Sequence, residues 1–162
     1  MRVFLLLLLL FPLNAHATDD PFRSTPYPMP RFVSLASNEI NVRAGPGERY
    51  PVKWVYHQNH RPVEIILEYD SWRKIRDKDG ETGWVHSALL SGRRYGIATA
   101  EPFTLLHKKS QPDSPLKLRL APDVVVELKS CESSWCHAEI GKESGWIERK
   151  SIWGVYEREM FD

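Results

Sequence analysis

The sequence has no strong charge of either sign and no long hydrophobic run after Phe11. It contains 22 lysines and arginines and 21 aspartates and glutamates, and the two counts are equal once Arg2 is set aside. Such a balance gives no large electrostatic attraction to nucleic acid or to an anionic membrane, so we expect neither as a partner. No apolar period of 3.6 residues lasts longer than two turns, which excludes a long helix.

Motifs for catalysis or metal binding are also scarce. His57 and His60 form an H-x-x-H pair without a third ligand nearby, which favours surface histidines. Residues 77–81 resemble a calcium loop but lack its continuing ligands, so we expect a hairpin turn there. His86-Ser87 lacks the G-x-S-x-G context of a nucleophile. We therefore expect no enzyme, no metal and no cofactor, although an enzyme with an unrecognised titratable pair stays open.

The N-terminus has the pattern of a secretory signal peptide, assigned to residues 1–17. A positive start, Met1-Arg2, precedes the apolar run Val3–Phe11, and Ala15-His16-Ala17 is a cleavage site of the small-x-small type. A membrane anchor is the alternative, but the run is about half of the roughly 20 residues that span a bilayer. We therefore expect an exported protein, periplasmic or extracellular, that does not span the membrane.

Residues 18–31 are rich in proline and poor in core-forming side chains. They contain Pro21, Pro26, Pro28 and Pro30. We interpret the segment as an extended linker that holds the first domain off its surroundings. The alternative is an arm that packs along the first domain through Phe22 and Tyr27.

From Phe32 onward, apolar and polar residues alternate in short runs such as Val52-Lys53-Trp54-Val55-Tyr56. The runs are separated by turn residues, among them Gly45-Pro46-Gly47, Asp70-Ser71 and Asp77-Lys78-Asp79-Gly80. This pattern predicts an all-β barrel or sandwich.

The second half of this region repeats the first. Trp72 corresponds to Trp135 at an offset of 63 residues, and Gly83-Trp84-Val85 corresponds to Gly145-Trp146-Ile147 at an offset of 62. A repeat of this length predicts one small barrel in each copy. We assign a first domain to residues 32–93, a second to 94–157 and a loose tail to 158–162, in which Met160 and Phe161 could still dock. The short joint between the copies predicts that they touch.

Both copies resemble the bacterial SH3 (SH3b) domain of exported, cell-envelope proteins. The resemblance rests on Asn41-Val42-Arg43-Ala44-Gly45-Pro46-Gly47, on Trp72 with Arg73 and Ile75, and on Gly83-Trp84-Val85. It implies two tandem, partly open SH3-like barrels that tether a protein to peptidoglycan or bind a peptide. The second copy is degenerate, because Thr104–Lys109 replaces the first motif.

The first motif also has a structural role. We expect Gly45 and Gly47 to adopt positive φ angles, with Pro46 fixing the corner between them. Val42 is expected in the core, and Arg43 is expected to face outward or brace the loop. Gly83 before Trp84 predicts a strand that passes closely by another strand.

The first copy carries aromatic residues that its core does not clearly need. Tyr50, Trp54 and Tyr69 have no aromatic counterpart in the second copy, whereas Trp72 corresponds to Trp135. SH3-type barrels bind in an aromatic cleft beside their long first loop. Our candidate ligand-binding residues are Tyr50, Trp54, Tyr69, Trp72 and Arg43, although the fold alone also accounts for Trp72 and Arg43.

The two cysteines, Cys131 and Cys136, flank a predicted hairpin turn. In an oxidising compartment they should form a disulfide, and the alternative of a redox-active pair lacks a helix start. The repeat aligns them with Glu68 and Arg73, so the first copy has an opposite-charge pair at the same position. We expect this pair to be exposed and weaker than the disulfide.

Together these features predict a non-catalytic exported module that binds peptidoglycan. The alternative is a protein-interaction or scaffold role in the envelope, in which the first copy presents a peptide groove.

Overall fold

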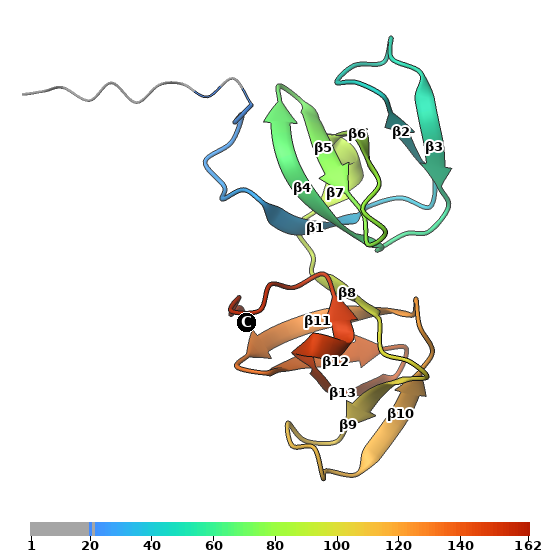
Figure 1. Ribbon diagram of the computed structural model, residues 1–162, viewed down its shortest axis with the longest axis vertical. Coiled ribbons are helices and arrows are strands. Elements are labelled where there is room, and N and C mark those ends of the chain that lie inside the picture. Colours follow the sequence, from blue (N-terminus) through green and yellow to red (C-terminus); the bar gives the residue numbers. More distant parts are fainter. Residues whose placement is uncertain (1–19, 21) are drawn as a thin grey trace, which may run out of the picture.

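The computed structural model describes residue 20 and residues 22–162, which form two seven-stranded sheets (Figure 1). The first sheet contains β1 (Arg31–Leu35), β2 (Ile40–Arg43), β3 (Val52–Tyr56), β4 (Pro62–Tyr69), β5 (Trp72–Arg76), β6 (Thr82–His86) and, after the 3₁₀ helix η1 (Ser87–Leu89), β7 (Leu90–Ser91). The second contains β8 (Tyr95–Ala98), β9 (Thr104–His107), β10 (Leu116–Leu120), β11 (Val125–Glu132), β12 (Trp135–Ile140), β13 (Glu143–Glu148) and, after η2 (Arg149–Ser151), β14 (Ile152–Trp153). The predicted signal peptide lies outside the described residues, within which no helix is long and apolar enough to cross a membrane.

The two sheets have the same strand order. The first runs β3-β2-β6-β5-β4-β1-β7 and the second β10-β9-β13-β12-β11-β8-β14, so each strand has a counterpart seven strands later. The register repeats as well, because Phe32 lies opposite Glu64 and Tyr95 lies opposite Glu127. The predicted all-β fold of two small tandem barrels is therefore confirmed.

Each barrel encloses its own core of aliphatic side chains. Alternation along β2 turns Ile40 and Val42 inward, where both are almost completely buried. The first core also contains Val33, Leu35, Val63, Ile65, Ile75 and Val85. The second contains Ala98, Leu106, Leu120, Val126, Leu128, Ala138, Ile147 and Ile152, with both cysteines. The placement of Val42 in the core agrees with the sequence.

The glycines of the first loop and of β6 are required for reasons that differ in part from those expected. Gly45 and Gly47 were expected at positive φ, but the described glycines with positive φ are Gly80, Gly141 and Gly154, so that expectation is wrong. Gly45 is required because a Cβ atom there would lie 2.5 Å from the Tyr50 ring. Gly83 does mark a close approach, since its Cβ would lie 2.4 Å from a Val42 methyl group.

The described part of the N-terminal segment packs against the first barrel. The Glu68 amide donates to the carbonyl of Phe22 (2.9 Å), and the Glu68 carboxylate accepts from the amides of Ser24 (2.9 Å) and Thr25 (2.7 Å). We expected an extended linker, but residues 22–31 follow the alternative of a packed arm. The reason is Glu68, whose buried carboxylate needs donors that the arm supplies.

The C-terminal tail packs on the second barrel in a corresponding way. The Cys131 amide donates to the carbonyl of Phe161 (2.9 Å), and Arg94 forms a two-pronged ion pair with Glu159. The tail is therefore docked rather than loose, because β11 offers a free amide and Arg94 a free guanidinium. Cys131 and Glu68 are equivalent positions, so the ends of β4 and β11 each receive one terminal segment.

The barrels touch through aromatic side chains, as the short joint predicted. The Phe32 ring lies 4.9 Å from Trp153 and 4.7 Å from Tyr156, and His60 stacks on Tyr95 at 4.6 Å. The Tyr156 hydroxyl donates to Glu64 (2.8 Å). Burial, with the hydrogen bond to Glu64, raises the pKa of Tyr156, so the hydroxyl keeps its proton.

The predicted cross-strand equivalence of the charge pair and the disulfide is present. Glu68 lies opposite Arg73, and Cys131 lies opposite Cys136, to which it is bonded. The disulfide prediction is confirmed, but the expected exposure of the charge pair is wrong: Glu68 is 0% exposed and Arg73 8%. Burial acts to raise the pKa of Glu68, but hydrogen bonds from Arg31 and Thr25 and the charges of both arginines outweigh it, so the pKa lies below its usual value.

Candidate functional site

The loop after β2 is held by Arg43, one of the residues predicted as a ligand contact. Its Nη1 atom donates to the carbonyls of Glu48 (3.0 Å) and Tyr50 (2.9 Å), so Arg43 braces the loop. The Tyr50 ring covers Gly45, and the Arg49 guanidinium lies 5.1 Å from the ring centroid. Both donors of this Arg43 nitrogen are directed at the loop itself rather than outward.

The other predicted residues of the first barrel fall into two groups. Trp54 on β3 packs against the core and meets Tyr56 edge-on at 6.0 Å. Tyr69 lies opposite Trp72 at the turn between β4 and β5, and Trp72 meets His86 edge-on at 5.5 Å. Tyr69 is 47% exposed, and its availability for a ligand stays a prediction.

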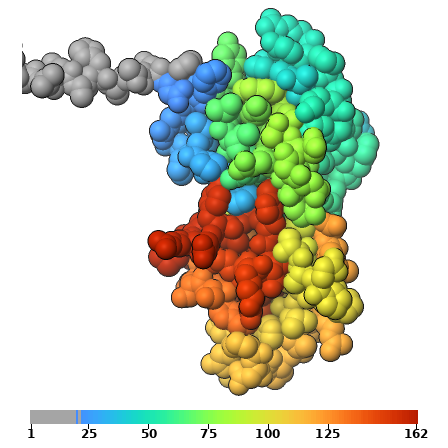
Figure 2. Space-filling model, viewed as in Figure 1, coloured from blue at the N-terminus to red at the C-terminus, as the bar shows by residue number. Residues whose placement is uncertain are grey.

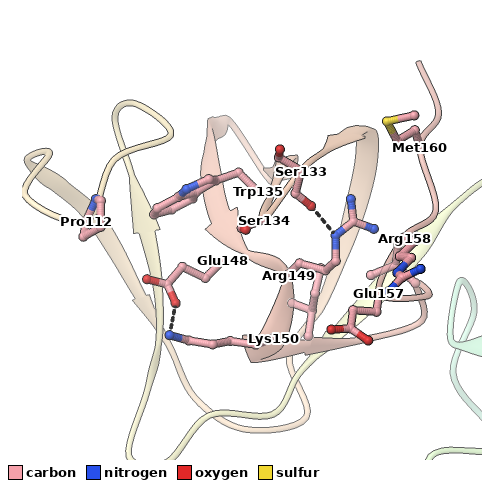
Figure 3. Close-up of a pocket in the computed structure, with 12 residues that line it drawn as sticks. Pro112, Ser133, Ser134, Trp135, Glu148, Arg149, Lys150, Glu157, Arg158 and Met160 are labelled. Atoms are coloured by element: carbon pink, nitrogen blue, oxygen red, sulfur yellow. Dashed lines mark hydrogen bonds and ion pairs between the residues drawn. The ribbon is translucent and has the colours of Figure 1, made fainter.

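A cleft of about 970 Å³ lies in the second barrel (Figure 3). One wall carries Trp135 and Pro112, and the opposite wall carries Arg158 and Met160 from the tail. Glu148, Lys150 and Glu157 lie along the lower part of the view. The cleft thus combines an aromatic face with charged groups of both signs.

The Trp135 side chain is held in place from behind. His107 at the end of β9 meets it edge-on at a centroid distance of 5.3 Å. The His107 ring is buried, and its Nδ1 atom lies 3.1 Å from the carbonyl oxygen of Ser114. Because β9 and the following loop fix His107, the Trp135 ring is preorganised as one wall of the cleft.

Arg149 joins the turn before β12 to the tail. Its Nε donates to the carbonyl of Ser133 (2.8 Å), and its Nη1 donates to the carbonyls of Tyr156 (2.7 Å) and Glu159 (2.7 Å). Its Nη2 is buried and has no hydrogen-bond partner among the described residues. A buried unpaired N–H costs free energy, so this nitrogen favours a ligand or water oxygen.

The cleft occupies a position that the first barrel also possesses. Trp135 corresponds to Trp72, and the Arg149 amide donates to the Ser134 carbonyl (2.8 Å) just as the Ser87 amide donates to the Ser71 carbonyl (2.8 Å). The sequence predicted a ligand site in this region of the first copy, and that assignment stays a prediction.

Sequence reasoning missed the cleft residues of the second copy. Trp135 was considered only as the counterpart of Trp72. Arg149 and Lys150 have no basic counterpart in the first copy, in which Ser87 and Ala88 occupy the equivalent positions. The difference between these basic residues and their counterparts can be read from the repeat. The wall that the tail adds to the cleft cannot be read from it, because that wall depends on the docking of Glu159 and Phe161.

The chemistry of this cleft suits non-covalent binding. Within the part of the chain that the structure describes, no three His, Cys, Asp or Glu side chains are close enough to hold a metal ion. Lys150 forms an ion pair with Glu148 (2.5 Å). An aromatic face, a buried guanidinium and paired charges can stack on and hydrogen-bond to a ligand.

Comparison with known proteins gives a family match in both halves. The model of the family described as "Bacterial SH3 domain" matches residues 36–92 and again residues 101–154. The curated "Putative N-acetylmuramoyl-L-alanine amidase YrvJ" of Bacillus subtilis (strain 168) is 30% identical over 115 residues, which cover 70% of this chain. This chain spans only 22% of the length of that relative.

Two solved structures have a weaker likeness. NlpC2 from Trichomonas vaginalis is 10% identical, with a TM-score of 0.36, over 78% of this chain and 49% of its own. An NlpC/P60 family protein from Bacillus cereus ATCC 10987 is 9% identical, with a TM-score of 0.34, over 75% and 55% respectively. Likenesses this low carry no inference about the present chain.

Proposed function

Because this chain belongs to the bacterial SH3 domain family, with two copies of the domain in tandem, we propose that it is an exported, non-catalytic module that binds peptidoglycan. The ligand site that we propose is the cleft beside Trp135. The observation that carries this assignment is the fixed indole face, supported by His107 at 5.3 Å, opposite polar groups of the tail. Sugar rings stack on such a face, and paired charges can orient the polar substituents.

Two further observations support a role in the envelope. The Cys131–Cys136 disulfide is typical of proteins that fold in an oxidising compartment. The matched relative is named as an amidase of N-acetylmuramoyl-L-alanine, a linkage in peptidoglycan. Since this chain spans 22% of that relative, we carry over no catalytic activity from it.

One observation favours a second candidate, the recognition of a peptide segment of an envelope protein. The unpaired Nη2 of Arg149 is suited to a main-chain carbonyl oxygen. Pro112 and Trp135 would then line the groove for an extended peptide, as in other SH3-type recognition.

The test is co-sedimentation of the protein from Thr18 to Asp162 with purified peptidoglycan sacculi, using a matched pair of single variants and one double variant. Ser134→Trp fills the cleft of the second barrel, and Ser71→Trp makes the same change at the equivalent turn of the first. Trp54→Ala/Tyr69→Ala removes the aromatic candidates predicted from sequence. Circular dichroism spectra and unfolding midpoints confirm that each variant folds.

We expect the wild type and Ser71→Trp to sediment with sacculi and Ser134→Trp to stay in the supernatant. Loss of binding in Ser71→Trp or in the double variant alone would move the ligand site to the first barrel. If the folded wild type does not sediment at all, the peptidoglycan proposal fails and the peptide alternative takes its place.

A further inference from the structure

A second pocket, of about 540 Å³, lies where both barrels and both terminal segments meet. The N-terminal segment and the C-terminal tail lie on the same side of the molecule, on either side of this junction (Figure 2). The apolar lining of the pocket consists of Tyr27, Pro28, Phe32, Val33, Ile65 and Leu90. None of the residues that line the cleft beside Trp135 belongs to it.

Three arginines from separate parts of the chain line this pocket. Arg31 belongs to β1, Arg73 to β5 and Arg94 to the joint between the barrels. Arg73 is 8% exposed, and its Nη1 is fixed by the carbonyls of Asp70 (2.7 Å) and Trp72 (2.9 Å). The positive charge is therefore part of the built structure rather than a set of mobile surface side chains.

Fewer carboxylates than arginines meet in this place. Among the described residues, Glu68 pairs with Arg31 (2.6 Å) and Arg73 (3.4 Å), and Glu159 pairs with Arg94. Burial acts to raise the pKa of Glu159, but hydrogen bonds from Arg94 and the Tyr156 amide outweigh it, so its pKa lies below the usual value. Both carboxylates are therefore ionised at neutral pH, and one positive charge remains without a counterion.

One donor of this group also lacks a partner. The Nη atoms of Arg94 serve Glu159 and the carbonyl of Gly154, whereas its Nε is buried and unpaired within the described residues. A buried guanidinium N–H favours an acceptor, and an anionic oxygen is the strongest kind.

We propose that this pocket binds a small monoanion with an apolar body, a carboxylate or sulfonate joined to an aromatic or branched aliphatic group. The surplus positive charge of the arginines selects the anionic group, and the apolar lining of the pocket receives the apolar body. The site is separate from the cleft beside Trp135 and does not depend on peptidoglycan binding.

The test uses a matched pair of fluorescent probes. 8-Anilino-1-naphthalenesulfonate carries the anionic group, and N-phenyl-1-naphthylamine has the same aromatic body without it. Substituting the arginines would also break their pairs with Glu68 and Glu159, so the pocket is blocked instead. Gly92 lines it, and a Cβ atom there would meet no atom within 4 Å, so Gly92→Trp fills the space. Ala88→Trp, at an exposed position outside the lining, is the control.

We expect saturable one-to-one binding of the sulfonate and binding of the neutral probe that is about tenfold weaker. Gly92→Trp should weaken sulfonate binding by at least about tenfold, with Ala88→Trp unchanged. Equal affinity for both probes would overturn the selection of an anion, and unchanged binding in Gly92→Trp would overturn the location. Because this variant should still sediment with sacculi, failure here is distinguishable from failure of the proposed function.

Discussion

At one equivalent position, the two barrels join neighbouring strands by different chemistry. In the first barrel, Glu68 and Arg73 face each other across β4 and β5, and in the second, Cys131 and Cys136 face each other across β11 and β12. All four residues are buried. A buried disulfide needs no hydrogen-bond partner, whereas a buried carboxylate requires hydrogen-bond donors from other segments.

This difference explains how the terminal segments dock. Glu68 receives Arg31 from β1 and the amides of Ser24 and Thr25 from the N-terminal segment. Arg94 is the counterpart of Arg31, but Cys131 offers it no carboxylate. The C-terminal tail supplies Glu159 instead. The residue at this strand position thus determines what the terminal segment supplies, which is amide donors for Glu68 in the first barrel and a carboxylate for Arg94 in the second.

The largest expected effect is on the charge pair. Glu68→Gln keeps the shape of the side chain but leaves Arg31 and Arg73 without a counterion, and we expect a loss of about 3–5 kcal/mol in the free energy of unfolding. Urea denaturation followed by tryptophan fluorescence measures it. The control is Glu132→Gln, at the exposed end of β11 in the second barrel, where a change within about 0.5 kcal/mol is expected. Equal effects in both variants would contradict the role of the buried pair.

A smaller effect is expected for the disulfide. Cys131→Ala/Cys136→Ala should lower the free energy of unfolding by about 2 kcal/mol, because the cross-link closes a short loop. The same urea titration with and without reductant tests it. Reductant should bring the wild type to the stability of the variant and leave the variant unchanged. A wild type that is insensitive to reductant would show that the cross-link adds nothing.

The strand order and the repeat were predictable because they rest on local patterns. Alternating apolar residues indicate the strands, and the offset of 63 residues aligns Cys131 with Glu68 from the sequence alone. The burial of Glu68 was not predictable, since its donors Ser24 and Thr25 lie more than 40 residues away in the chain. No periodicity links a proline-rich segment to the strand that it covers.

The sequence predicted a ligand cleft in the first barrel, whereas the cleft that we propose as the ligand site lies in the second barrel. The SH3-like fold predicts a cleft beside the first loop of a barrel. In the second barrel, the walls of the cleft also depend on Arg149 and on the docked tail. Because the first motif is absent from the second copy, the sequence favoured the first barrel, and that assignment stays a prediction. The degenerate motif of the second copy weakens the family signature without removing the cleft. In the first copy the motif braces the loop through Arg43, whereas in the second copy the C-terminal tail forms one wall of the cleft.

The smallest effect expected is a local one, on pH. The pKa of Glu68 is lowered in the folded state, so its contribution is complete above the unfolded value of about 4.3 and is lost as the pH falls through the lower folded pKa. The amides of Ser24 and Thr25, which donate to this carboxylate, should therefore lose hydrogen-exchange protection in acid before the barrel opens. Hydrogen-exchange NMR measures it, with the Leu35 amide, which donates to the Arg61 carbonyl, as a reference within the same barrel. If all three amides lose protection together, the arm is not held by the ionised carboxylate but unfolds with the barrel. The disulfide of the second barrel has no titrating partner, so only the first barrel should release its terminal segment through the cross-strand pair.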